Sequence, residues 1–224
     1  MSSPQDRRTL LQNVGHKIST PLTDIMQLAD TILYGAEGEV SPLVRENISQ
    51  MRGAAEGVLA IAEKLLGLVS IDSLPQEHSV IEIAYAIQRV YNEVQPLANT
   101  LHRQLVLDME DDLTLLDANS DYLQQALHIL LTTMIRLAHN DTIHIIVRAA
   151  ERFVIVSVQD GQSAAIPHEV PIRDFLRAHP DSELGLDLLI CQRIAEVHNG
   201  NLWLTSGQEL ANSTWHISWP IANN

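Results

Sequence analysis

The chain has 224 residues, 46% of them hydrophobic, which is enough for one large or two small domains; its formal net charge is −14, without a clustered basic face for nucleic acids or anionic membranes. The single cysteine, Cys191, excludes an intramolecular disulfide and a multi-cysteine metal site, the polar start resembles no signal peptide, and no apolar run reaches the ~20 residues of a membrane span. We therefore expect a cytoplasmic protein with protein partners, no nucleic-acid binding and no direct membrane insertion.

Residues 1–72 have the periodicity of two amphipathic helices joined by a turn at 34–40, which contains two glycines. Ser41-Pro42 is typical of an N-cap and first turn, so it predicts where the second helix starts. Apolar or small residues recur in alternating steps of three and four along both helices. These residues are Leu11, Val14, Ile18, Leu22, Ile25, Ala29 and Ile32, followed by Val44, Ile48, Met51, Ala55, Val58, Ala62, Leu65 and Val69.

One such helical pair, about 42 Å long at roughly 28 residues per helix, cannot enclose its own apolar seam. A symmetric homodimer that forms a four-helix bundle would enclose it. The alternative is an intramolecular helical pair packed on the rest of the chain, and periodicity alone leaves both open.

His16 lies two residues from both Val14 and Ile18, off the apolar stripe, so we expect it to face solvent or a docked partner. Thr20 shares its helix face by the i, i+4 spacing. Pro21 removes one backbone hydrogen bond and is expected to kink the helix. Taken singly, these residues also fit a surface histidine, a back-bonded helical threonine and a structural kink.

Residues 73–79 form a short polar linker with Pro75, and residues 80–224 predict an α+β layer sandwich. Helices are expected near 80–101, 120–138, 172–178 and 184–198. Strands are expected at 104–109, 113–117, 142–149, 152–159, 201–206 and 214–220, the third and fourth as a hairpin. Asn199-Gly200 is typical of a left-handed cap after the last helix.

The run Val14-Gly15-His16-Lys17-Ile18-Ser19-Thr20-Pro21-Leu22 resembles the phosphoacceptor box of two-component sensor histidine kinases. The resemblance implies that His16 accepts a phosphoryl group and that Thr20 helps to orient the water that hydrolyses a phosphoaspartate on the partner. The family has an acid where this chain has Lys17. An acid would accept the proton from the second imidazole nitrogen. Lys17 cannot, although its ammonium group could attract the phosphoryl group instead.

Residues 113–221 resemble the ATP-binding domain of the same kinases, a fold shared with gyrase and Hsp90, most closely over 185–200. The resemblance assigns Asp160 to the adenine amino group, Arg136 to phosphate and Gly185 to the phosphate loop. Several other nucleotide-binding positions differ from the family. Ile129 and Thr133 replace two asparagines, one of them the magnesium ligand; Gln162 and Ala164 replace glycines; and Asp187 replaces the second glycine of a Gly-Leu-Gly-Leu box.

These departures predict a degenerate site that binds ATP weakly or not at all. A carboxylate at Asp187 about 5 Å from a phosphate would cost roughly 3 kcal/mol per unit charge at an effective dielectric of about 20, provided that it points toward the phosphate. We therefore expect no cofactor and no metal, with ATP and magnesium used only if the degenerate site still functions.

The sequence thus predicts a phosphorelay protein that passes phosphoryl groups through His16 to or from response-regulator receiver domains, as a homodimer. One alternative is a weakly active sensor histidine kinase, or a regulator phosphatase that uses Thr20. The other is a non-enzymatic signalling scaffold, in which His16 is never phosphorylated.

Overall fold

The computed structural model describes residues 4–35, 40–71, 79–161, 168–178, 185–206 and 214–222. The chain divides into two compact units, Met1–Ser73 and Leu74–Asn224. No helix among the described residues combines the length and apolarity needed to cross a membrane. Each unit is described separately below.

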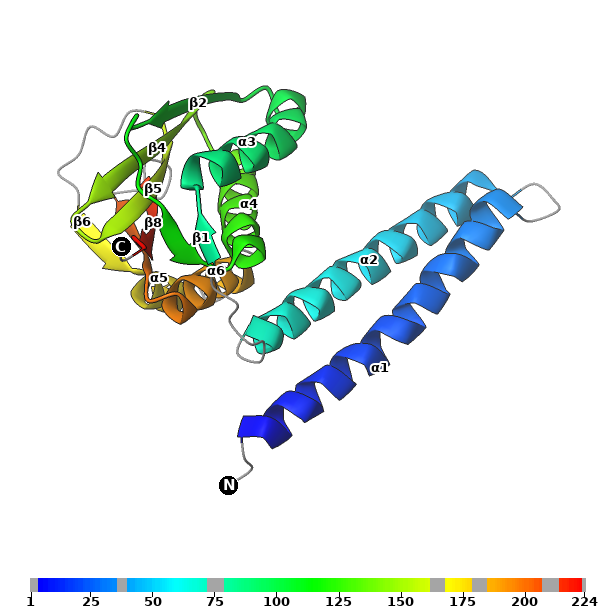
Figure 1. The fold of residues 1–224 in the computed structure, drawn as a ribbon. Helices are drawn as coiled ribbons and strands as arrows, with labels where there is room; N and C mark the ends of the chain where they lie inside the picture. Colours follow the sequence, from blue (N-terminus) through cyan, green and yellow to red (C-terminus); the bar gives the residue numbers. More distant parts are fainter. Residues whose placement is uncertain are drawn as a thin grey trace. The chain divides into compact units, whose positions relative to one another are not determined.

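The first unit is a helical hairpin (Figure 1). Helix α1 (Pro4–Asp30) passes into a π-helical turn, η1 (Thr31–Gly35), and α2 (Pro42–Ile71) runs back along it. Two arginines of α2 contact the end of α1 and the turn after it. Arg52 Nη1 lies 2.9 Å from Asp30 Oδ1, and Arg45 donates to the Leu33 carbonyl oxygen at 3.2 Å. Ser41 Oγ accepts the backbone N–H of Val44 at 3.4 Å, which confirms Ser41 as the N-cap of α2. Most of the predicted turn lies outside the described residues.

The predicted apolar stripe of this hairpin divides into two in the structure. Three of its residues, Ala29, Ala55 and Ala62, are buried. Seven others stay exposed, at 38–41% on α1 and 45–61% on α2. The exposed residues recur every seven positions and are Ile18, Ile25 and Ile32 on α1, and Val44, Met51, Val58 and Leu65 on α2. A seven-residue repeat is typical of helices that pack against further helices.

The second unit is built on a six-stranded sheet in the order β2-β4-β5-β8-β7-β6. Only β2 and β4 pair in parallel; the other neighbours are antiparallel. The strands are β2 (Gln104–Met109), β4 (Thr142–Ala150), β5 (Phe153–Asp160), β6 (His168–Pro171), β7 (Asn201–Ser206) and β8 (Thr214–Pro220). Two further short strands, β1 (Ser79–Ile81) and β3 (Leu116–Ala118), pair with each other.

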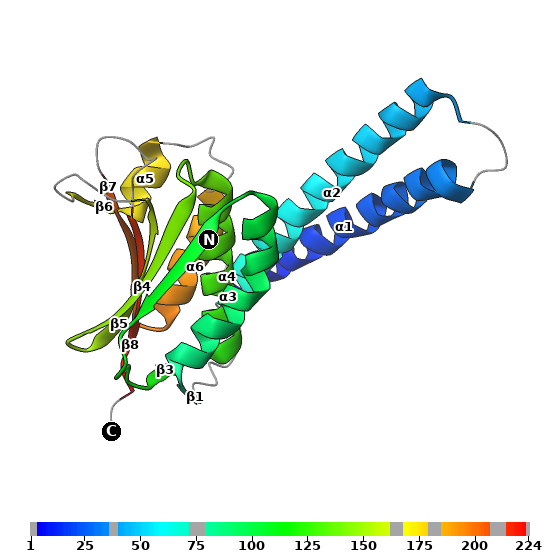
Figure 2. The same ribbon diagram turned by 90° about the horizontal axis from the view of Figure 1, so that it is seen from above.

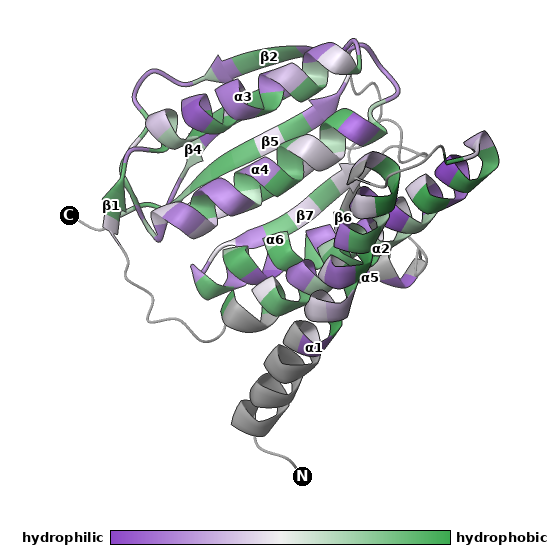
Figure 3. Ribbon diagram, turned by 90° about the vertical axis from the view of Figure 1, so that its right-hand side faces the viewer, coloured by the Kyte–Doolittle hydropathy of each residue, from purple (hydrophilic) through white to green (hydrophobic). Residues whose placement is uncertain are grey.

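Helices α3 (Ile83–Thr100), α4 (Ser120–Leu137) and α6 (Gly185–Val197) cover one face of the sheet, with the short α5 (Ile172–Ala178) next to β6 and β7 (Figure 2). The alternation along strand β5 explains why only one face is covered by helices. Val154, Val156 and Val158 are fully buried, whereas the residues between them are only partly covered. Figure 3 shows the largely hydrophobic strands of the sheet behind the three helices. This is the α+β sandwich predicted from the sequence.

Most predicted elements are confirmed, and three differ. The helix predicted from 80 begins at Ile83, because residues 79–81 pair with β3. The strand predicted at 113–117 is shorter and later, at Leu116–Ala118. Strand β6 was not predicted, since its segment is polar and proline-rich; Pro171 is tolerated there because β6 is an edge strand.

The turn after α6 confirms the predicted left-handed cap. Asn199 has φ 58°, and the Gly200 N–H donates to the Ala195 carbonyl oxygen at 2.8 Å. A Cβ on Gly200 would lie 1.9 Å from the Ser218 carbonyl oxygen on β8. Only glycine therefore allows the chain to enter β7 so close to β8.

Candidate functional site

The segment around His16 lies in the middle of α1, which continues through Pro21. The side chain of His16 is outside the described residues, whereas Lys17 and Thr20 are exposed. Gly15 is buried against α2: a Cβ there would lie 2.4–2.6 Å from the Leu66 side chain. The two helices thus approach closely at the residue before His16.

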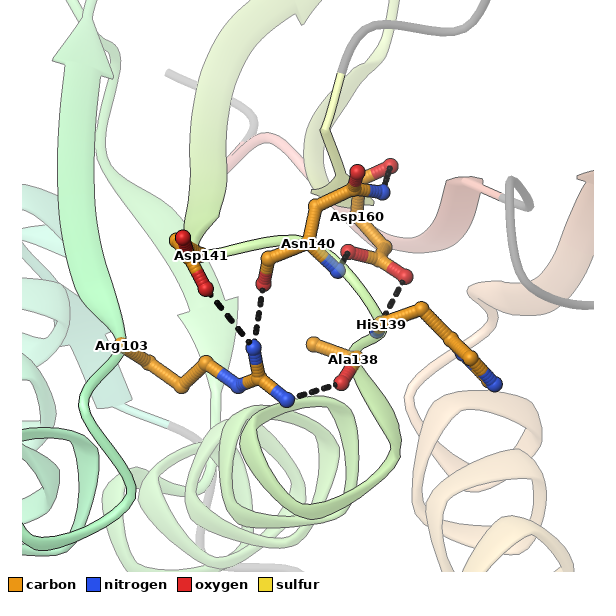
Figure 4. Close-up of polar contacts among 6 residues, drawn as sticks. All are labelled: Arg103, Ala138, His139, Asn140, Asp141 and Asp160. Carbon is orange, nitrogen blue, oxygen red and sulfur yellow. Dashed lines mark hydrogen bonds and ion pairs between the residues drawn. The ribbon is translucent and has the colours of Figure 1, made fainter.

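In the second unit, Asp160 at the end of β5 is only 3% exposed, and its carboxylate holds the loop that follows α4 (Figure 4). Asp160 Oδ2 accepts the backbone N–H of His139 at 2.9 Å, and Oδ1 accepts that of Asn140 at 3.0 Å. Gly161 follows at φ 68°, and a Cβ there would meet the Asn140 side chain at 2.6 Å. Charge-assisted bonds of this kind are among the stronger hydrogen bonds in proteins.

Arg103 holds the same loop from its carbonyl side (Figure 4). Its guanidinium donates to the Ala138 carbonyl oxygen at 2.5 Å and to that of Asn140 at 2.9 Å, and lies 3.3 Å from Asp141 Oδ1. Asp160 and Arg103 together provide hydrogen-bond partners for backbone N–H and C=O groups of the loop that follows α4. Arg103 was missed in the sequence, because its partners lie 35 to 38 positions away and no local pattern marks them.

The other predicted nucleotide positions lie on α4 and α6, which pack against each other. Arg136 is exposed in the last turn of α4, Ile129 is half-buried, and Thr133 is buried. Gly185 is the first residue of α6 and is half-buried. The structure therefore brings Arg136, Asp160 and Gly185 into one unit, and places His16 and Thr20 in the other.

Asp187 lies in the first turn of α6. Its Oδ1 is buried. Burial, and to a lesser degree the charge of Asp187, raises the pKa of the Cys191 thiol, which contacts the Ala126 carbonyl oxygen of α4. A carboxylate in the first turn interacts favourably with the positive end of the helix dipole. That end is also where helices bind phosphate, so Asp187 opposes a second anion there.

Known proteins resemble this chain in sequence and in fold. Residues 118–223 match the family model described as "Histidine kinase-, DNA gyrase B-, and HSP90-like ATPase". These residues form a histidine kinase-type ATPase domain. Over its length the chain is similar to the catalytic core of sensor histidine kinases.

Relatives of known function share this organisation. The adaptive-response sensory kinase SasA of Synechococcus elongatus is 26% identical over 93% of the chain, and the sensor histidine kinase MtrB of Mycobacterium leprae is 24% identical over 90%. The chain spans only 57% and 38% of their respective lengths. Among solved structures, full-length ShkA has a TM-score of 0.74 at 17% identity, covering all of this chain and 47% of ShkA. Acinetobacter baumannii AdeS has a TM-score of 0.62, also at 17% identity, with 93% and 98% coverage.

The family implies ATP and magnesium, and several side chains of this ATPase domain differ from those that the family uses for them. Ile129 and Thr133 offer no amide oxygen to a metal ion, and Asp187 adds negative charge to the N-terminus of α6. Among the described residues, no group of three His, Cys, Asp or Glu side chains could hold a metal ion. Each oxygen of Asp160 already accepts a backbone N–H, so this acid has a structural role besides the predicted one.

His198, which closes the family's helix motif, joins α6 to α4. Its imidazole is fully buried; Nδ1 lies 2.7 Å from the Ile194 carbonyl oxygen, and Nε2 accepts the Asn119 N–H at 3.1 Å. Asn119 in turn caps α4, because its side-chain oxygen accepts the N–H groups of Asp121 and Tyr122. The neutral tautomer with the proton on Nδ1 satisfies both contacts. This histidine therefore has a structural role in the ATPase domain.

A second polar cluster, around His216, lies on the face of the sheet opposite the helices. His216 Nδ1 lies 2.7 Å from Ser157 Oγ, Nε2 lies 2.9 Å from Thr205 Oγ1, and the ring stacks on Trp203. Burial lowers the pKa of His216 to about 4. Both ring nitrogens have neutral hydroxyl partners, so no nearby acid offsets this loss of hydration.

We expect this cluster to make the ATPase domain less stable in acid. The pKa of His216 is about 4 in the folded state and about 6.5 in the unfolded state. The contribution of the neutral ring to the free energy of unfolding is therefore fully present above pH 6.5 and is lost as the pH falls to 4. Since the ring is partly exposed, we expect a loss of about 1–2 kcal/mol. Denaturant titrations of wild type and His216→Gln at pH 7, 5 and 4 measure the difference. Equal pH dependence in both proteins would contradict the assignment.

Proposed function

We propose that this protein is a homodimeric phosphorelay component that carries a phosphoryl group on His16 without using ATP of its own. The observation that carries the proposal is a mismatch within one chain. The box around His16 keeps Thr20-Pro21-Leu22, whereas the ATPase domain has other residues at two asparagine and three glycine positions of its nucleotide boxes. A phosphoacceptor without an ATP site needs another phosphorylated protein as its donor.

Response-regulator receiver domains are the proposed partners. In this scheme His16 exchanges a phosphoryl group with an aspartate of such a domain, in either direction. The relatives named above are sensor kinases, which supports a place in two-component signalling. The exposed Lys17 and Thr20 make the α1 surface around His16 accessible to a docking partner.

The homodimer is proposed from the apolar residues that the hairpin leaves exposed. Ile25, Met51 and Val58 belong to two seven-residue repeats, one on each helix, that the partner helix does not cover. A second copy of the hairpin offers the same repeats in return, as a symmetric interface requires. The two hairpins would then share one core as a four-helix bundle.

Two measurements on the full chain test the proposal. First, titration calorimetry with Mg-ATP should give no binding heat, and micromolar affinity would instead favour an autokinase. Second, the chain is incubated with receiver domains phosphorylated by a small-molecule donor. We expect acid-labile, alkali-stable label on this protein that is lost in His16→Ala; the matched control, His128→Ala on the exposed face of α4, should keep it.

The pattern of label separates the alternatives. Loss of receiver phosphate without label on this protein, abolished in Thr20→Ala, would point to a phosphatase. Absence of both label and dephosphorylation with every receiver domain of the source genome would leave a scaffold and contradict transfer through His16.

A further inference from the structure

The only two lysines of the chain, Lys17 and Lys64, lie in the hairpin unit, in a protein with a formal net charge of −14. Gly15 of α1 abuts Leu66 of α2, so in this antiparallel pair Lys17 and Lys64 belong to the same level of the hairpin. This is also the level of His16. Lys17 is exposed and Lys64 is half-buried.

Two arginines of the same unit, Arg45 and Arg52, lie toward the loop end, whereas Arg7 and Arg8 lie near the start of α1. Arg52 pairs with Asp30 and Glu56, and Arg45 donates to the Leu33 carbonyl oxygen. Lys17, in contrast, forms no ion pair with any described residue. Its charge is therefore available at the surface next to the phosphoacceptor.

A phosphoryl group on imidazole carries close to two negative charges. A neighbouring acid would repel this group, whereas an ammonium attracts it and disfavours the second ring proton that makes imidazole a good leaving group. A local cation also offsets the repulsion between an acidic protein and an anionic donor. Lys17 thus favours loading of His16 and slows its loss of phosphate.

We infer that Lys17 is an electrostatic holding residue that stabilises the phosphohistidine form of His16, so that transfer runs preferentially from phosphoaspartate to histidine. This inference rests on the proposed function. In the step, an imidazole nitrogen forms the new P–N bond, and the bond from phosphorus to the aspartyl oxygen breaks. The electron pair remains on the carboxylate, and the second ring nitrogen later releases its proton to solvent.

The test uses potassium phosphoramidate as donor, so that no partner protein is needed. Loading of His16 and decay of the phosphohistidine are followed by ³¹P NMR in the wild type, in Lys17→Gln and in Arg89→Gln. Arg89 is exposed in the other unit, and its replacement removes the same charge. We expect Lys17→Gln to load several-fold more slowly and to decay several-fold faster, and Arg89→Gln to match the wild type. In 0.5 M salt, where the Debye length is about 4 Å, the difference should largely disappear.

The outcomes separate the two proposals. If the wild type never shows a phosphohistidine signal that is absent in His16→Ala, the proposed function fails and this inference fails with it. If His16 loads but Lys17→Gln loads and decays like the wild type, only the holding role of Lys17 is overturned. A salt-independent effect would likewise contradict an electrostatic role.

Discussion

Replacing Asp160 by asparagine is expected to lower the free energy of unfolding of the ATPase domain by about 2–3 kcal/mol. The carboxylate is buried and accepts two backbone N–H groups, from His139 and Asn140. Asparagine keeps one acceptor oxygen but turns an NH₂ group toward the second N–H. The variant therefore loses one charge-assisted bond and leaves a backbone donor without its acceptor. Guanidinium titration followed by tryptophan fluorescence measures the change.

The matched control for this experiment is Asp141→Asn, one residue along the clamped loop. The substitution Asp141→Asn also removes one carboxylate charge. The Asp141 side chain, however, is 93% exposed, and its ion pair with Arg103 is at the surface. We expect a change below about 0.5 kcal/mol. Equal effects in Asp160→Asn and Asp141→Asn would show that Asp160 does not hold the loop.

Placing two glutamates on the exposed stripe of α2, as Met51→Glu with Val58→Glu, is expected to convert the protein from dimer to monomer at micromolar concentration. In the proposed bundle each residue would be buried against the second hairpin, and burying an unpaired carboxylate costs several kcal/mol. Because the proposed interface is symmetric, each substitution occurs in it twice, once in each copy of the chain. Sedimentation velocity or light scattering after size exclusion gives the mass, and circular dichroism shows whether the helices persist.

Gly53→Glu with Ala60→Glu provides the control on the same helix. These positions are exposed, have the same spacing of seven and lie two residues further along, on another face of α2. This variant should remain dimeric with the same added charge. A wild-type monomer, or a dimer that survives both double variants, would contradict the bundle.

Much of the second unit could be predicted from local patterns. The bounds of β2, α5, β7 and β8 agree with the predictions, because alternation, apolar runs and turn residues mark them directly. Strands β1 and β6 could not be found, since short edge pairings depend on partners distant in sequence. The clamp formed by Asp160 and Arg103 was hidden for the same reason.

The hairpin illustrates a different limit of the sequence. Periodicity identified many positions of the apolar stripe but missed Gly15 and Leu33, which are buried, and it could not say which residues face the neighbouring helix. The buried residues of the hairpin include alanines, Gly15 and the larger Leu33, whereas Ile25, Met51 and Val58 stay at the surface. The small residues let α1 and α2 approach closely, as Gly15 does against Leu66.

The buried thiol of Cys191 has a practical consequence. It is the only cysteine of the chain, it is completely buried, and its raised pKa keeps it protonated. Maleimide and methanethiosulfonate reagents should therefore leave the native protein unlabelled. A single cysteine introduced at exposed Gln50 would then carry a spin label or fluorophore without removal of Cys191. Distances between two such labels would measure how hairpins assemble in solution, in an otherwise unaltered protein.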